Sequence, residues 1–216
     1  GDQHSLAVTS SGRVYAWGEN SDGQLGNGED ICIEPDRLSL RNIVAVSAGQ
    51  NHSLALDESG VVWAWGENSD GQLGNSSTSP EIEPIESDMV NAKSITAGDC
   101  CSFAISEDEE LYGWGENRKG QLGTGDSDSC DSPTLIDFEN PEVVYALNST
   151  VILDKNKNIW VCGSNAYGQL GLGTMDTEEE TLIQLEDIKE DIVDVAVSQS
   201  FIVLLQADGT VLGSGS

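Results

Sequence analysis

The chain has very few positive charges. Its 216 residues include 9 Lys and Arg against 38 Asp and Glu, which gives a formal net charge of -29 at pH 7. Binding to nucleic-acid phosphates requires clustered Lys and Arg, and such clusters are missing here. The same charge opposes contact with an anionic membrane surface. The composition therefore predicts neither a direct nucleic-acid partner nor a membrane partner.

Long apolar runs and a signal peptide are also lacking. No apolar run reaches the roughly 18 residues of a membrane-spanning helix, and the N-terminus lacks the pattern of a secretory signal. The cysteines are odd in number and none is spaced as a paired zinc ligand, so we expect reduced thiols. They are Cys32, Cys100, Cys101, Cys130 and Cys162. These features predict an intracellular protein, cytoplasmic or nuclear.

Groups that perform catalysis or bind metals are scarce. His4 and His52 are the only histidines, and no Gly-x-Ser-x-Gly turn is present. The sequence therefore predicts no catalytic residue and no cofactor. The loops at Asp22 and Asp70 resemble calcium loops, but Lys119 takes the place of the Asp in the third copy. We expect no metal, and instead expect Asn and Asp side chains to cap these turns.

What the chain does contain is a repeat of about 49 residues. A Gly-Gln-Leu-Gly loop occurs four times, and its final glycines are 48, 49 and 48 residues apart. A Trp-Gly-Glu-Asn signature precedes three of these loops, and Cys162 replaces the Trp before the fourth. We interpret these residues as the structural repeat motif: Trp17, Gly26, Trp65, Gly74, Trp114, Gly123 and Gly171. A period of this length indicates a solenoid, a propeller or an array.

Each repeat also predicts a set of short strands. In the second copy the extended runs are 43–47, 52–57, 61–65 and 81–86. Glycine in three of the hairpins supplies a positive φ, and Asn is expected to take that conformation in the hairpin at 156–158. Four strands per repeat make one blade. The predicted fold class is all-β, a β-propeller of four-stranded blades.

These signatures, together with a Gly-x-x-His strand at His4 and His52, resemble the regulator of chromosome condensation repeat. The resemblance implies a seven-bladed propeller, of which about four and a half blades are present. We expect a single partial-propeller domain over 1–216. Its approximate repeats are 1–48, 49–97, 98–145, 146–197 and a truncated 198–216. The remaining blades, or another chain, are expected to close the ring, because open repeat arrays expose their terminal faces.

The two histidines occupy equivalent places, 48 residues apart. One interpretation is that each imidazole holds a neighbouring loop. The family resemblance implies another, because exchange factors for Ran-type GTPases use loops bearing this His to grip the GTPase. Only His4 and His52 match that pattern, since Cys101, Ser149 and Phe201 stand at the later positions.

Acidic residues are concentrated between the repeat signatures. Segments 27–42, 75–92, 124–142 and 172–194 hold 23 of the 38 acidic residues. Because they occupy the same part of each repeat, we expect them to gather on one side and to attract basic partners. The candidate partner-binding residues are His4, His52, Asp2, Asp99, Asp126, Asp128, Glu178, Glu179 and Glu180. General solubility or a salt-rich habitat would also account for the acidity.

Three functions agree with the sequence. The first is a non-enzymatic protein-interaction propeller whose acidic loop face binds basic protein segments. The second is a guanine nucleotide exchange factor for a Ran-like small GTPase. The third is a propeller module of a larger protein such as a ubiquitin ligase.

Overall fold

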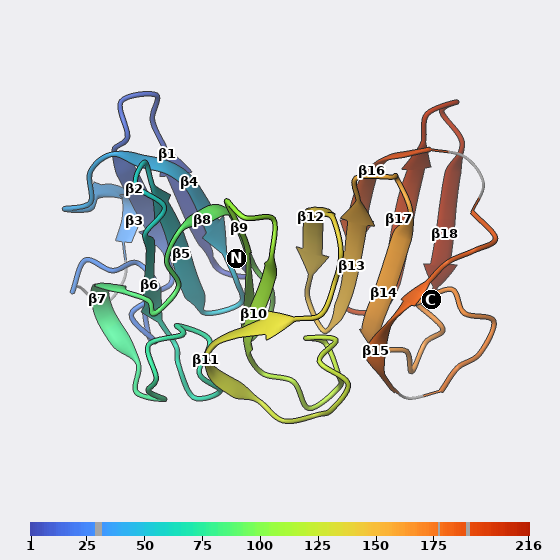
Figure 1. The fold of residues 1–216 in the computed structure, drawn as a ribbon. Helices are drawn as coiled ribbons and strands as arrows, with labels where there is room; N and C mark the ends of the chain where they lie inside the picture. The colour runs from blue at the N-terminus through green and yellow to red at the C-terminus, as the bar shows by residue number, and fades with distance from the viewer. Residues whose placement is uncertain (29–31, 177, 189–190) are drawn as a thin grey trace. The chain divides into compact units, whose positions relative to one another are not determined.

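A computed structural model describes residues 1–28, 32–176, 178–188 and 191–216. The described residues form antiparallel strands and no helix (Figure 1). They fall into two compact units. The first comprises Gly1–Glu116 with Ser129–Leu135, and the second comprises Asn117–Asp128 with Ile136–Ser216.

The first unit contains three sheets in which consecutive strands are neighbours. Their order is β1-β2-β3, β4-β5-β6-β7 and β8-β9-β10-β11. The strands are β1 (His4–Val8), β2 (Val14–Gly18), β3 (Cys32–Arg37), β4 (Ile43–Ala48), β5 (His52–Asp57), β6 (Val62–Gly66), β7 (Glu81–Glu86), β8 (Ala92–Ala97), β9 (Cys101–Ser106), β10 (Leu111–Gly115) and β11 (Cys130–Ile136), whose last residue falls in the second unit.

The second unit contains two sheets of the same kind, in the orders β12-β13-β14-β15 and β16-β17-β18. The strands are β12 (Pro141–Ala146), β13 (Ser149–Asp154), β14 (Ile159–Ser164), β15 (Glu178–Gln184), β16 (Ile192–Val197), β17 (Phe201–Gln206) and β18 (Val211–Gly215). In each four-stranded sheet the strands that open and close the repeat are the edge strands.

The strands predicted for the second copy are confirmed. β5 and β7 have the expected bounds, β4 extends one residue further, and β6 is shifted by one residue. Apolar side chains on the middle strands face the neighbouring sheet within a unit. Leu54 and Val62, for example, pack with Trp114 in one buried cluster. Alternating large and small residues therefore let the sheets stack closely.

The expectation for the hairpin at 156–158 was wrong in one detail. The residue with positive φ is Lys157, at 68°, and not an Asn. Its place matches Gly60 in the second copy, where φ is 85°. The Asp154 carboxylate accepts hydrogen bonds from the backbone N–H groups of Asn156 and Asn158, both at 2.8 Å. This side-chain cap holds the turn, so the conformation follows from the Asp rather than from Asn at its tip.

Candidate interaction site and the contacts that position it

The turn between the first two strands of a repeat and the loop after the third lie at the same end of the sheet. The antiparallel register pairs His52 with Gly66, so β6 ends where β5 begins. Glu67 N–H donates to the Asn51 carbonyl at 2.9 Å and joins the two connections. The Gly-x-x-His turns and the Gly-Gln-Leu-Gly loops are therefore neighbours in space.

The histidines connect successive repeats inside the first unit. Ser53 Oγ donates to the Gln24 carbonyl at 2.7 Å, so it accepts from His4 Nε2–H at 2.9 Å. The second copy repeats this relay, with His52 Nε2 on Ser102 Oγ at 2.9 Å. Each imidazole is thus a neutral donor at Nε2 that fixes a loop of its neighbour.

Both imidazoles are buried, with 3% of His4 and none of His52 exposed. Burial and then the adjacent N-terminal amino group lower the pKa of His4 to about 4. Burial, followed by the proximity of His4, lowers the pKa of His52 to about 3. The two side chains therefore lie beneath the loops that they hold, and almost none of their surface is exposed to solvent.

The glycine of the Gly-x-x-His turn is required by a close approach. A Cβ on Gly49 would lie 2.2 Å from His52 Cε1 and 2.4 Å from the Gly98 carbonyl oxygen. The fourth copy has lost both members of the pair, because Ala146 and Ser149 replace the glycine and the histidine. The glycine therefore makes room for the imidazole and for the next repeat.

The Gly-Gln-Leu-Gly loop is held by an Asn and a Gln. Asn68 Oδ1 accepts from Leu73 N–H at 2.9 Å, and Asn68 Nδ2 donates to the carbonyls of Ser77 and Ser79. Gln72 Oε1 accepts from Asp70 N–H at 3.0 Å. The expected Asn cap is present, and Gln72 supplies a further cap that was not predicted. The described residues contain no group of three His, Cys, Asp or Glu side chains arranged for a metal ion.

One backbone carbonyl in each loop accepts a donor from the third strand of the next repeat. Trp65 Nε1 donates to the Gln24 carbonyl, and Trp114 Nε1 donates to that of Gln72, both at 2.9 Å. In the second unit, Cys162 Sγ takes this role at 3.5 Å on Gln121. Both Trp side chains are fully buried, whereas Trp17 is partly buried.

The loop glycines have a packing reason. A Cβ on Gly74 would lie 2.7 Å from Trp114 Nε1, and the backbone there has a positive φ of 64°. The other three loops also end on glycines of positive φ, namely Gly26, Gly123 and Gly171.

The predicted acidic residues fall into two groups. In the first unit, Asp2 is exposed and accepts from Gln50 Nε2 at 3.4 Å, whereas Asp99 is only 5% exposed. The Asp99 carbonyl accepts from Gln50 N–H at 3.0 Å, so Gln50 connects the two turns. Of this group, the structure presents only Asp2 to solvent.

The second group comes together in the second unit. Gly125 N–H donates to the Glu180 carbonyl at 2.9 Å, and Thr124 forms a bridge with Thr181, so loop 117–128 lies along β15. This contact brings Asp126 and Asp128 to the strand that begins with Glu178–Glu180. Asp126 Oδ1 also accepts from Thr124 Oγ1 at 2.9 Å, which orders the loop. Glu178, Glu180, Asp126 and Asp128 are exposed, and Glu179 is partly exposed. We call these five residues the acidic patch.

The acidic segments do not keep to one end of a sheet. Each includes the edge strand that closes the repeat and the connection at the opposite end. In the second unit, Glu186 and Asp187 follow β15 at that far end. The acidic residues are therefore spread along the edge strand, because each acidic segment extends from one end of its sheet to the other.

Some contact residues were not singled out from the sequence. The hydroxyls of Ser53, Ser102 and Thr150 bind the loop carbonyls of Gln24, Gln72 and Gln121 at 2.7–2.8 Å. A Ser or Thr directly follows the histidine position in each of these repeats, and this pattern in the sequence could have identified them. No described helix has the length and apolar character needed to cross a bilayer.

Known proteins share both the sequence pattern and the fold. The chain is similar to probable E3 ubiquitin-protein ligase HERC6 of Homo sapiens, with 48% identity over 54 residues, which are 23% of this chain and 5% of the ligase. It is similar to Protein RCC2 of Homo sapiens, with 40% identity over 52 residues, which are 22% of this chain and 10% of RCC2. These matches cover a tenth or less of either relative.

Solved structures match over nearly the whole chain. Prp20p from Saccharomyces cerevisiae, whose structure was described with its binding properties to Gsp1p and histones, has a TM-score of 0.90 and 23% identity. The match covers 99% of this chain and 56% of Prp20p. Human WBSCR16 has a TM-score of 0.89 and 23% identity, over 99% of this chain and 59% of that one. These likenesses show the fold. Because the model of the RCC1-like domain matches residues 1–216, the chain belongs to the RCC1-like domain family.

Proposed function

We propose that this chain is a non-enzymatic interaction scaffold that binds basic protein segments through its acidic patch. The observation that carries the proposal is the contact between loop 117–128 and β15, which places Asp126 and Asp128 beside Glu178–Glu180. The net charge of -29 adds a long-range attraction for basic partners. Among proteins of this fold, Prp20p has been described as binding histones, which are basic.

The test is a titration of a labelled basic peptide with the full-length protein, in which fluorescence anisotropy measures the affinity at increasing salt concentrations. Affinity should fall steeply between low and physiological ionic strength, because exposed charges are screened over about 8 Å at 0.15 M. Replacing Glu178, Glu179 and Glu180 with Gln should weaken binding about tenfold, since each exposed charge pair contributes up to about 1 kcal/mol.

A matched variant controls for net charge. Glu58→Gln, Glu107→Gln and Asp108→Asn remove three exposed charges from hairpins of the first unit. This control should bind the peptide nearly as well as the unaltered protein. An affinity that does not depend on salt, or an equal loss in both triple variants, would contradict the proposal.

Exchange activity on a Ran-like GTPase is a second candidate. The similarity in fold to Prp20p favours it, because that protein was described with its binding to Gsp1p. The burial of His4 and His52 means that any such contact would use the surrounding loops rather than the imidazoles. Nucleotide release from small GTPases in the presence of the full-length protein is the measurement, and no acceleration for any of them would exclude this function.

The chain also fits a module of a larger protein such as a ubiquitin ligase. The 48% identity with HERC6 over 54 residues favours this arrangement. We propose in addition that further blades, or another chain, complete a ring of about seven, and that the protein is intracellular. A crystal structure of the full-length protein would count the blades, and imaging of the tagged protein would give its location.

A further inference from the structure

The strand that closes the fourth repeat differs from the other closing strands in one residue. The closing strands β3, β7 and β11 each contain a proline, namely Pro35, Pro84 and Pro133. Leu182 takes this place in β15, because the residues that follow Pro84 and Leu182 pair with equivalent residues of the third strand. Among the closing strands, only β15 therefore has no proline.

The prolines stand where the backbone points away from the sheet. Ser87 N–H, three residues after Pro84, donates to the Val62 carbonyl at 2.8 Å. Because successive residues of an antiparallel strand bond to opposite sides, Pro84 is turned to the outer edge, where its missing N–H breaks no hydrogen bond of the sheet. β7 is an edge strand although the next sheet has all four of its strands. An unpaired outer edge is thus regular for a closing strand, and the proline keeps other strands from pairing with it.

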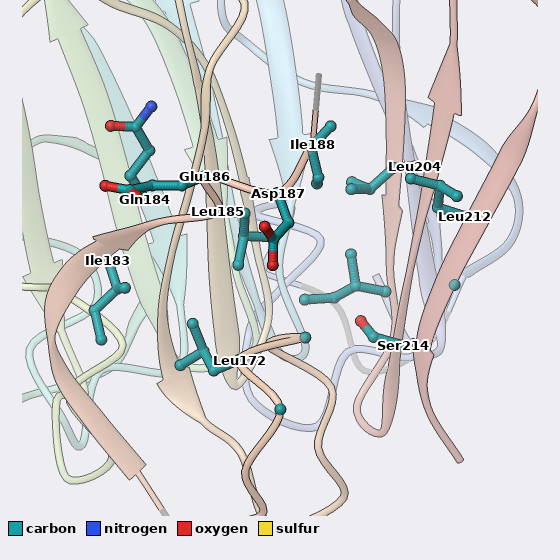
Figure 2. Close-up of a pocket in the computed structure, with 14 residues that line it drawn as sticks. Leu172, Ile183, Gln184, Leu185, Glu186, Asp187, Ile188, Leu204, Leu212 and Ser214 are labelled. Carbon is teal, nitrogen blue, oxygen red and sulfur yellow. The ribbon is translucent and has the colours of Figure 1, made fainter. Parts of the chain in front are cut away.

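In β15 the same side carries backbone N–H groups. Leu185 N–H donates to the Ile159 carbonyl at 2.9 Å, so by the same alternation the N–H and C=O groups of Leu182 and Gln184 point outward. No described residue accepts a hydrogen bond from either N–H. Figure 2 shows the side chains of Ile183 and Gln184 leaving β15 in opposite directions, as in any extended strand. We call the outward side of Leu182–Gln184 the β15 edge.

The first part of the same strand already pairs on its outer side. Gly125 N–H donates to the Glu180 carbonyl at 2.9 Å, beside the antiparallel bridge between Thr124 and Thr181. The outward groups of β15 are therefore placed for strand pairing. This contact ends before Leu182, so the β15 edge leaves two donors and two acceptors in line with it.

The exchange of proline for leucine has a packing cause as well. A Cβ on Gly123 would lie 2.9 Å from Leu182 Cγ. The same atom on Gly26 would lie 2.8 Å from the Trp65 indole and 3.2 Å from the Pro84 ring. Leu182 thus fills volume that the indole fills in the second repeat. The exchange also returns an N–H group to the outer edge, where it is available to another strand.

Charge selects the strand that would bind. Residues 172–188 hold six Asp or Glu and no Lys or Arg. Glu178–Glu180 lie on one side of the β15 edge, and the exposed Glu186 and Asp187 follow on the other. A second copy of this chain, with its net charge of -29, would be repelled. An extended segment with Lys or Arg at both ends and uncharged residues between them complements both the charges and the backbone groups.

We propose that the β15 edge binds a basic, extended protein segment by β-strand addition. The backbone of the segment pairs with Leu182 and Gln184, and its basic ends lie near the acidic patch and near Glu186 with Asp187. In this mode main-chain hydrogen bonds supply affinity and side chains supply selectivity. The inference rests on the proposed function and deepens it, because it states how a basic segment is held beside the acidic patch.

The test uses the full-length protein and labelled peptides of about ten residues, each with Lys at both ends and β-branched residues at the centre. One peptide is unmodified. Two others carry N-methyl groups on two alternate central residues, one peptide on each side of its strand. Methylation of the side that faces β15 should weaken binding about tenfold, because two backbone hydrogen bonds are lost. Methylation of the other side should change affinity by less than about threefold.

A double variant tests the same hydrogen bonds from the side of the protein. Cys162→Trp with Leu182→Pro reproduces the Trp65 and Pro84 pair of the second repeat and removes the N–H of the β15 edge. Its matched control, Cys162→Trp with Leu182→Ala, keeps that N–H. The proline variant should bind the unmodified peptide at least about fivefold more weakly than the control does. Should it fail to fold, the methylated peptides on the unaltered protein decide the question.

Equal affinity of the two methylated peptides, or equal affinity of the proline variant and its control, would overturn strand addition. A dimer of the full-length protein that dissociates only in the proline variant would show that a second copy occupies the edge, and would overturn the basic segment as its occupant. If all three peptides bind equally, with steep salt dependence and a loss in the Glu178–Glu180 variant, the proposed function stands without strand addition. If no peptide binds, both fail.

Discussion

Replacing His52 with Cys should remove a large part of the acid sensitivity of folding. His52 is fully buried, donates from Nε2 to Ser102 Oγ, and has no partner at Nδ1 among the described residues. Cys is the natural choice, because the third repeat places a buried Cys101 at this position and keeps Gly98. The variant thus follows a solution that the chain already uses.

The size of the effect follows from the pKa of His52, which burial lowers to about 3. The unfolded chain takes up a proton near pH 6.5, whereas the folded state stays neutral until much lower pH. The titration of His52 therefore does not change the free energy of unfolding well above pH 6.5, and it lowers that free energy progressively as the pH falls toward 3. At pH 5 the loss should be about 2 kcal/mol, since one pKa unit corresponds to about 1.4 kcal/mol.

Urea unfolding followed by tryptophan fluorescence at pH 7.5 and pH 5 measures this effect. The 38 acidic residues also titrate, but they do so in both proteins. The quantity of interest is therefore the pH-dependent change for the unaltered protein minus that for His52→Cys. A difference below about 0.5 kcal/mol would refute the assignment of a buried, neutral imidazole.

Two further predictions concern the contacts between repeats, and both are checked by urea unfolding. Gly49→Ala should lower the free energy of unfolding by about 2 kcal/mol or more, because its Cβ would lie 2.4 Å from the carbonyl oxygen of Gly98 in the next repeat. Adding His52→Ser should recover part of this loss. An unchanged midpoint for Gly49→Ala would contradict the close approach. Trp65→Cys should lower the free energy of unfolding by about 3–5 kcal/mol. Pro84→Leu should recover about 1 kcal/mol when it is added to Trp65→Cys, but should not stabilise the unaltered protein. Strictly additive effects would show that the two positions do not share one space.

The strands could be predicted from the sequence because their signals are local. Leu54, Ala55 and Leu56 form a short apolar run in 52–57, and Gly60 follows it in a hairpin turn. The repeat then transfers these assignments to weaker copies. β14 is an example, because its Trp signature has become Cys162 but its register matches that of β6.

The side-chain network could not be predicted in the same way. The spacing showed that His4 and His52 are equivalent, but their burial depends on where the Ser hydroxyl of the next repeat points. The acidic patch depends on the Gly125 contact with Glu180, which joins residues far apart in the chain. These contacts depend on the directions in which backbone carbonyls and hydroxyls point, and the spacing of the repeat does not specify those directions.

The decay of the repeat signature along the chain is accompanied by compensation in the packing. The loop carbonyl keeps a third-strand donor as the residue changes from Trp65 to Cys162 and then to Ser214. The hydrogen bond to the loop carbonyl is therefore kept in each of these repeats. The large side chain beside it changes place, because Leu182 of the fourth strand lies where the Trp indole would be. At Ser214 the donor remains but no described residue supplies that bulk, so a cavity stays open beside it. The packing of the repeats is therefore preserved where the signature decays at Cys162, because a larger residue on the fourth strand takes over the volume of the indole.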